Sequence, residues 1–150
     1  MPELYFEDLQ PGLVHQLGSV AVTEDEILDF ARRWDPQSFH VDPEAAKQSV
    51  FGGLIASGWH TGAMWMRLYV DSLLDGAASM GSPGIEELRW LAPVRPGDTL
   101  DGRLTVLEAT TSERRPDRGT VRIRGEMVNQ DGVTVLSMVS RGHFGRKLPG

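Results

Sequence analysis

The alternation of apolar and polar residues divides the chain into a helical first half and a strand-rich second half. Residues 23–26, Thr-Glu-Asp-Glu, form a capping-box pattern that predicts the start of a helix. That helix is expected to end at Asp35, because a residue that precedes proline is disfavoured in the α conformation. An Asp-Pro pair predicts a short helix over residues 42–47, and a second long helix is expected over about residues 56–74.

The second long helix is expected to be buried. Its apolar residues leave almost no polar face before Arg67 and Asp71. They are Trp59, Ala63, Met64, Trp65, Met66, Leu68, Tyr69, Val70, Leu73 and Leu74. A helix that is apolar nearly all round must be enclosed by protein, so we expect α-helical residues 56–74 to be buried against protein.

An alternation with a period of two residues predicts strands through most of the remaining chain. The expected strands cover residues 14–22, 85–94, 99–111, 120–129 and 133–144. A Gln-Asp-Gly turn at residues 130–132 is a hairpin signal, and most of the strands follow one another directly, which favours antiparallel pairing. One buried helix with a long antiparallel sheet predicts an α+β fold in which the sheet wraps around the helix.

The composition excludes several classes of protein. The 150 residues suffice for a single domain with a hydrophobic core, over residues 1–150. The absence of cysteine excludes disulfides, thiolate metal sites and cysteine nucleophiles. A net charge of −6 argues against nucleic-acid binding, which needs a basic face. No apolar run suits a membrane span and the acidic N-terminus is unlike a signal peptide, so we expect a cytoplasmic protein.

Asp35 and His40 are the strongest candidates for chemistry. Histidine has an ordinary pKa of about 6.5 and exchanges protons near neutral pH, and a nearby aspartate can help to bind and polarise one water molecule. In a helix, a spacing of five residues would set the two about 140° apart, but Pro36 prevents a helix there and allows a compact turn that aims both into one cavity. From the residues alone, a turn-capping aspartate and a backbone-bonded histidine are at least as good an interpretation.

The Ser57-Gly58 pair at the start of the second long helix is the next candidate. Glycine near a helix N-terminus lets a ligand approach bare backbone N–H groups at the positive end of the helix dipole. Such a group stabilises a thioester oxygen that gains negative charge. A glycine that is needed only for close packing explains the residue at least as well.

Other residues give weaker signals. Trp59 and Trp65 are expected first in the core, although they and Ser57 are also candidates for a substrate pocket. Three arginines within residues 114–118 form a basic loop that suits phosphate groups, but such a run is more often a solvated hairpin tip. No pair of histidines has the spacing of metal ligands, and we expect neither a metal nor a cofactor.

The stretch from Asp35 onward resembles the MaoC-like dehydratase family, which includes the (R)-specific enoyl-CoA hydratases. Asp35, His40 and Ala46 stand where that family has its Asp-x-Asn-Pro-(aliphatic)-His motif and a later small residue. Residues 51–58, Phe-Gly-Gly-Leu-Ile-Ala-Ser-Gly, are similar to the family's run into the helix. Two later turns also resemble the family, at residues 91–98 and 129–132. Three residues depart from the pattern. Gln37 and Ser38 replace the usual Asn and Pro, and Trp34 adds bulk beside the expected water site.

The resemblance implies a hot dog fold and a homodimer, or a larger oligomer built from dimers. It also implies an acyl-CoA or other acyl thioester substrate, in a tunnel near the dimer interface. By the same resemblance, Asp35 and neutral His40 activate one water molecule, and the Gly58 N–H holds the thioester oxygen. The implied reaction is (R)-specific hydration of a trans-2-enoyl thioester, or the reverse dehydration of a 3-hydroxyacyl thioester.

Two other functions of the same fold stay open. A hot dog thioesterase commonly uses a carboxylate on the central helix, but here that helix has no Glu, and Asp71 lies about thirteen residues beyond Gly58. The chain also suits a noncatalytic acyl-CoA-binding subunit, which would need the fold without the chemistry. The presence of both Asp35 and His40 favours the hydratase over these rivals.

Overall fold

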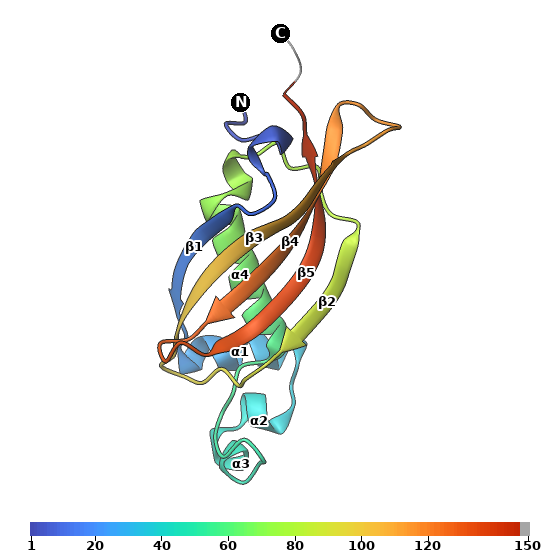
Figure 1. The fold of residues 1–150 in the computed structure, drawn as a ribbon. Coiled ribbons are helices and arrows are strands. Elements are labelled where there is room, and N and C mark those ends of the chain that lie inside the picture. Colours follow the sequence, from blue (N-terminus) through green and yellow to red (C-terminus); the bar gives the residue numbers. More distant parts are fainter. Residues whose placement is uncertain (148–150) are drawn as a thin grey trace.

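The computed structural model describes residues 1–147, in which a five-stranded antiparallel sheet curves around a long helix (Figure 1). The strands are β1 (Val14–Ala21), β2 (Gly84–Trp90), β3 (Thr99–Thr111), β4 (Arg118–Val128) and β5 (Thr134–Gly145). The helices are α1 (Glu24–Trp34), α2 (Ser38–Val41), α3 (Pro43–Lys47) and α4 (Gly58–Ser72), with short 3-10 turns η1 (Phe6–Asp8) and η2 (Leu74–Gly76). The predicted α+β class, with the sheet wrapped around the helix, is confirmed.

Local sequence signals explain most of the helix boundaries. The Thr23 hydroxyl accepts a hydrogen bond from the Glu26 N–H, which is the predicted cap of α1. The Asp42 side chain caps α3 in the same way. The long helix α4 begins at Gly58 and not at residue 56, because Ser57 is its N-cap and has a non-helical backbone.

The strands pair in the order β1-β3-β4-β5-β2, so that β1 and β2 form the edges of the sheet. Along β3, buried residues such as Leu100, Leu104 and Val106 alternate with exposed or half-buried ones, as the sequence predicts. Strand β2 ends at Trp90 and not at residue 94, ahead of Pro93, which has no N–H to donate to the sheet.

The hydrophobic core lies between α4 and the sheet. Trp65 of α4 is only 1% exposed and lies against Gly125 of β4, where an added Cβ would be 2.4 Å from the indole ring. The Trp65 Nε1–H donates to the carbonyl of Arg103 at 3.3 Å. Glycine at position 125 therefore allows the helix to approach the sheet closely enough for this contact.

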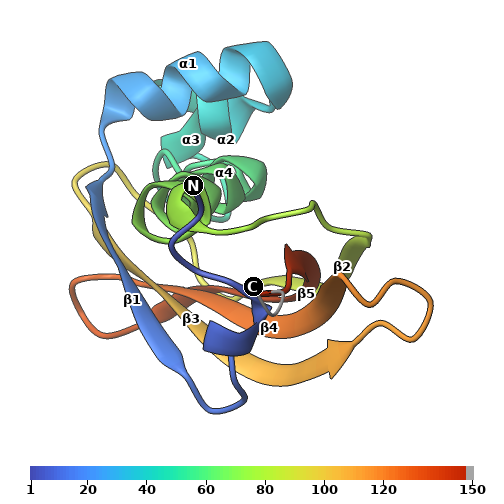
Figure 2. The same ribbon diagram turned by 90° about the horizontal axis from the view of Figure 1, so that it is seen from above.

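Within a single chain, α4 is covered on two sides and not on every side. The sheet lies on one side of α4, and the layer of α1, α2 and α3 lies on the other (Figure 2). Trp59 and Met66 on α4 are 60% and 46% exposed, so a strip of the helix stays uncovered. An apolar pattern shows that a surface avoids water, but it does not show whether the same chain covers it.

Candidate active site

A short linker between α1 and α2 brings Asp35 and His40 together. Helix α1 ends at Trp34, and Asp35 follows with a non-helical backbone, as the next residue, Pro36, requires. One helical turn over Ser38–Val41, where the sequence predicted only a compact turn, then carries His40 back toward the aspartate. The His40 Nε2 atom lies 3.3 Å from Asp35 Oδ2. The two residues therefore do meet, as their spacing and the proline suggest.

The surroundings of His40 determine which ring nitrogen carries the proton. The residue is buried, and its Nδ1 atom lies 2.7 Å from the carbonyl oxygen of Ile55. A carbonyl only accepts hydrogen bonds, so Nδ1 carries a proton, and in the neutral form of the ring Nε2 is the nitrogen without one. A structural histidine would make the same contact with a backbone carbonyl. Here that contact also favours the tautomer with its proton on Nδ1, which leaves Nε2 able to act as a general base.

Two side chains hold the Asp35 carboxylate. The Gln37 side-chain amide donates to Oδ1 at 2.8 Å, and the Ser57 hydroxyl donates to Oδ2 at 2.7 Å. Burial alone would raise the pKa of Asp35, but the hydrogen bonds from Gln37 and Ser57 oppose burial, and the pKa lies below its ordinary value. The aspartate is therefore ionised at neutral pH.

An apolar cavity of about 340 Å³ adjoins His40. Its wall includes the side chains of Phe39, Phe51, Ile55, Trp90 and Val135. Besides His40, the only other hydroxyl or ionisable side chain that lines it, within the described chain, is that of Thr61. Such a lining suits an apolar group whose reactive end meets the histidine. We call it the His40 cavity.

Gly58 lies at the wall of the same cavity, as the first residue of α4. The first N–H groups of a helix have no partner within the helix, and the Gly58 N–H has no backbone acceptor among residues 1–147. An added Cβ at this position would lie 2.3 Å from the Trp90 ring. Glycine is therefore required for packing, and the same lack of a side chain leaves its N–H bare.

The three candidates for a substrate pocket lie in different places. Ser57 is fully buried, and its hydroxyl is engaged by Asp35. Trp59 lies outside the His40 cavity and meets Trp90 edge to face, with ring centroids 5.2 Å apart. Trp65 lines a separate apolar cavity of about 260 Å³ between α4 and the sheet. The structure therefore does not bring these residues into one pocket.

Of the residues that depart from the family motif, Gln37 contacts Asp35 and Trp34 lies at the surface. Gln37 donates a hydrogen bond to the Asp35 carboxylate, a contact that its position in the motif alone did not reveal. Trp34 was expected to add bulk beside the water site, but it is 65% exposed and its ring lies 4.9 Å from the Arg33 guanidinium. Trp90, which shapes the wall next to Gly58, carried no signal in the sequence beyond its strand pattern.

His60 is a buried polar residue that has no contact with the Asp35 and His40 pair. Its ring stacks on Phe30 of α1, with centroids 4.7 Å apart and planes 9° apart. Its Nδ1 atom has no hydrogen-bond partner among residues 1–147. Burial lowers the pKa of His60, although the negative charge of Glu26 acts in the opposite direction. The contact between α1 and α4 therefore favours a neutral imidazole.

Other kinds of site have little support in the described part of the chain. Residues 1–147 contain no group of three or more His, Asp or Glu side chains that is placed to hold a metal ion. Within the same range, no helix has the length and apolar character needed to cross a membrane. Asp71 of α4 pairs with Arg67 at 2.9 Å on the surface.

Comparison with known proteins relates this site to an established family. The family described as the MaoC like domain matches residues 12–127. The crystal structure of a MaoC-like dehydratase from Rhodospirillum rubrum is 42% identical, with a TM-score of 0.87, over 97% of this chain and 99% of that one.

Two relatives named for reactions on CoA thioesters match most of the chain. The (R)-specific enoyl-CoA hydratase of Rhodospirillum rubrum is 27% identical over 137 residues, which are 88% of this chain and 90% of the relative. The 3-hydroxybutyryl-CoA dehydratase of Methylorubrum extorquens is 28% identical over 148 residues, which are 92% of this chain and 88% of the relative. The implied hot dog fold is confirmed by the structural match. With a match that covers residues 12–127, the chain belongs to the MaoC-like domain family.

Proposed function

We propose that this protein hydrates trans-2-enoyl thioesters, or dehydrates 3-hydroxyacyl thioesters, with Asp35 and His40 as the pair that activates water. The observation that carries the proposal is the 3.3 Å contact between the Asp35 carboxylate and Nε2 of His40, with His40 at the wall of an apolar cavity. The (R) configuration and the CoA carrier are supported by the names of two relatives, an (R)-specific enoyl-CoA hydratase and a 3-hydroxybutyryl-CoA dehydratase.

The proposed reaction adds one water molecule across the double bond. Atoms 3.3 Å apart allow one water to hydrogen-bond to both Asp35 and His40. His40 Nε2 removes a proton from this water while the water oxygen bonds to C3 of the enoyl group. The C2–C3 electron pair moves toward the thioester, whose oxygen becomes negative and accepts the Gly58 N–H. The proton on His40 then passes to C2, directly or through Asp35.

We further propose a homodimer that forms through β2 and the uncovered strip of α4. Strand β2 pairs only with β5 among the described strands, so its other edge is open. Ile85, Trp90 and Leu91, in or next to β2, are 45–54% exposed, and Trp59 and Met66 of α4 are exposed as well. Large apolar residues beside an open strand edge are typical of a protein interface.

Hydration of crotonyl-CoA, followed as the loss of enoyl-thioester absorbance, tests the proposed function. Asp35→Asn removes the carboxylate charge and His40→Ala removes the base, and each is expected to lower kcat/KM by about 10²- to 10⁴-fold. His15→Ala and Asp71→Asn are matched controls that are expected to keep full activity, because His15 lies on β1 and Asp71 is paired at the surface. Full activity of folded Asp35→Asn and His40→Ala proteins would refute the assignment.

The same preparation separates the proposed hydratase from its two rivals. Release of free CoA without hydration, detected with a thiol reagent, would identify a thioesterase. Binding of acyl-CoA with neither activity would identify a noncatalytic binding subunit. The pairing of Asp71 with Arg67 weighs against a thioesterase that uses a carboxylate of α4.

A further inference from the structure

Thr61 of α4 is a buried polar residue that takes no part in the reaction described above. The residue is only 2% exposed, and it lines the His40 cavity together with Gly58. Within residues 1–147, His40 and Thr61 carry the only ionisable or hydroxyl groups of that lining. A hydroxyl that is removed from bulk water and left without a partner costs free energy, so a partner for Thr61 is expected.

The protein itself does not supply this partner. The Thr61 hydroxyl makes no hydrogen bond to any group of residues 1–147. In a helix, a threonine hydroxyl commonly donates to the carbonyl four residues earlier, which here belongs to Ser57. That carbonyl already accepts the backbone N–H groups of His60 at 2.9 Å and of Thr61 at 3.1 Å. A carbonyl oxygen has two lone pairs, so the usual acceptor is occupied and the hydroxyl can donate to a ligand.

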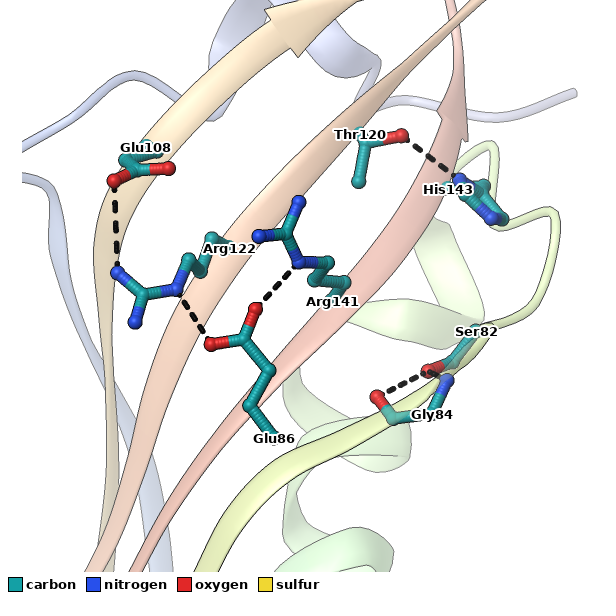
Figure 3. Close-up of polar contacts among 8 residues, drawn as sticks. All are labelled: Ser82, Gly84, Glu86, Glu108, Thr120, Arg122, Arg141 and His143. Carbon is teal, nitrogen blue, oxygen red and sulfur yellow. Dashed lines mark hydrogen bonds and ion pairs between the residues drawn. The ribbon is translucent and has the colours of Figure 1, made fainter.

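Hydroxyl groups outside the cavity show the contrast, because several of them have partners within the chain. The Ser82 hydroxyl donates to a backbone carbonyl at 3.3 Å, and the Thr120 hydroxyl lies 3.0 Å from Nδ1 of His143 (Figure 3). Neither Ser82 nor Thr120 lines the His40 cavity. Buried polar groups are normally hydrogen-bonded, so the unbonded hydroxyl of Thr61 is suited to a group that enters the cavity.

Helix geometry sets the Thr61 hydroxyl beside the Gly58 N–H. Gly58 is the first residue of α4, and a residue three positions later is rotated by about 300°, so the two directions differ by only about 60°. Side chains of a helix lean toward its N-terminus, which carries the hydroxyl back toward the level of Gly58. Positions at this spacing have Cβ atoms about 5–6 Å apart.

This spacing allows one ligand oxygen to accept hydrogen bonds from both groups. An oxygen that accepts two bonds of about 2.9 Å joins donors that lie up to about 5.8 Å apart. The Gly58 N–H and the Thr61 O–H fall within this span, and neither has an acceptor among residues 1–147. Two donors that meet at one oxygen form the arrangement that stabilises negative charge on a carbonyl oxygen.

The walls of the His40 cavity favour a strong interaction at this point. The Trp90 ring occupies the space beside Gly58, where an added Cβ would lie 2.3 Å from it. The rest of the lining is mostly apolar and includes Phe39 and Val135. In such surroundings a hydrogen bond to a charged oxygen is stronger than in water. Each donor therefore contributes more to the stability of an oxyanion than it would at the surface.

We propose that Thr61 is a catalytic residue whose hydroxyl donates a second hydrogen bond to the thioester oxygen, beside the Gly58 N–H. This inference rests on the proposed hydratase function. As water adds to C3, the C2–C3 electron pair moves toward the thioester, and both donors stabilise the negative oxygen without transferring a proton to it. When the proton from His40 reaches C2, the carbonyl forms again. The bond from Thr61 is thus stronger in the transition state than in the bound substrate, which lowers the barrier.

Kinetics of three variants with crotonyl-CoA test this role. Thr61→Val removes the hydroxyl with little change of shape, and it is expected to lower kcat on the order of 10- to 100-fold with little change in KM. Thr61→Ser keeps a hydroxyl and is expected to retain most of the activity. Thr120→Val removes a hydroxyl outside the cavity and is the matched control, with an expected wild-type kcat. A wild-type kcat in Thr61→Val would overturn the proposal.

Urea denaturation separates a catalytic role of Thr61 from a structural one. Thr61→Val breaks no hydrogen bond within the chain, and valine and threonine have similar helix propensities. The urea midpoint of this variant is therefore expected to equal or exceed that of the wild type. A lowered midpoint that accompanies the loss of kcat would assign Thr61 a structural role and would overturn the proposal.

Infrared spectroscopy of a bound thioester tests the contact without the reaction. Butyryl-CoA has the thioester but no C2–C3 double bond, so it cannot be hydrated, and a carbon-13 label at the thioester carbonyl identifies its band. A hydrogen bond to a carbonyl lowers the stretching frequency. The band is therefore expected to move to higher frequency in Thr61→Val and to stay in place in Thr61→Ser and Thr120→Val. An unmoved band in Thr61→Val would overturn the proposal.

Failure of the hydratase function would give a different result from failure of this inference. If the wild-type protein and Thr61→Val hydrate crotonyl-CoA equally well, the proposed function stands and the role of Thr61 is wrong. If the wild-type protein hydrates no enoyl thioester, the proposed function is wrong and the catalytic role of Thr61 is overturned with it. The wild type therefore tests the function, and the valine variant tests the residue.

Discussion

Replacement of Gly58 by alanine tests whether close packing against Trp90 shapes the start of α4. The new Cβ would lie 2.3 Å from the indole ring, whereas ordinary contacts begin near 3.4 Å, so the ring must move by about 1.1 Å. Overpacking of this kind costs about 1–3 kcal/mol, and displacement of Trp90 also weakens its edge contact with Trp59, which is worth about 0.5–1.5 kcal/mol. Because Trp90 is 45% exposed and can swing outward, we expect a loss near 2 kcal/mol.

Urea denaturation followed by circular dichroism measures this loss. With a typical urea dependence of about 2 kcal/mol per molar, Gly58→Ala is expected to lower the midpoint by about 1 M. Gly62→Ala is the matched control within the same helix, because an added Cβ there meets no heavy atom within 4 Å. Alanine is the better helix former, so the control is expected to gain up to about 1 kcal/mol.

Removal of the indole ring tests the cause of the loss. In the background of Trp90→Ala, the change Gly58→Ala is expected to become neutral or stabilising, because the overlap is gone. Equal shifts for Gly58→Ala and Gly62→Ala in the wild-type background would refute the packing argument. The alanine variant retains its backbone N–H, so a loss of activity without a loss of stability would point to a change in the approach of the substrate.

Two further predictions concern half-buried Asp35 and buried His60. Ser57→Ala removes a hydrogen bond to the Asp35 carboxylate and is expected to cost about 1–2 kcal/mol at neutral pH. Since the folded-state pKa of Asp35 is depressed, its stabilising effect is lost as the pH falls, so the difference from wild type should shrink below about pH 4; a constant difference from pH 7 to pH 3 would contradict this. For His60, the depressed folded-state pKa means that the unfolded chain takes up a proton first as the pH falls through about 6.5, so stability declines there. His60→Phe, which keeps a ring against Phe30, should flatten this decline in urea titrations between pH 5 and 7, and an unchanged slope would exclude His60 as its source.

Local signals in the sequence predicted most of the secondary structure and the meeting of Asp35 with His40. The cap at Thr23 and the alternation along β3 involve only residues that are close in sequence. Such short-range patterns specify the start of α1 and the buried face of β3 without information from the rest of the fold. Asp35 and His40 are also local, because a proline and one turn separate them. Their spacing alone did not exclude a structural role, and the surrounding motif raised the weight of a catalytic one.

Tertiary structure decided how Asp35 and His40 are held. The Ser57 hydroxyl that binds Asp35 is 22 residues away in the chain, and the Ile55 carbonyl that fixes the His40 tautomer is 15 residues away. Gln37 is close in sequence, yet its amide could have pointed to solvent as readily as to the carboxylate. No local pattern specifies such contacts, because they depend on where α4 and the segment before it settle against α2.

The burial of α4 was likewise predicted in part by the sequence and decided in part by the tertiary structure. Its apolar sequence determined that nearly every face would avoid water, because the hydrophobic effect depends on the area that is exposed. That effect has no direction, so the sequence did not determine what covers each face. Only the folded chain shows that the sheet and α1 cover two sides of α4 and that Trp59 and Met66 remain exposed.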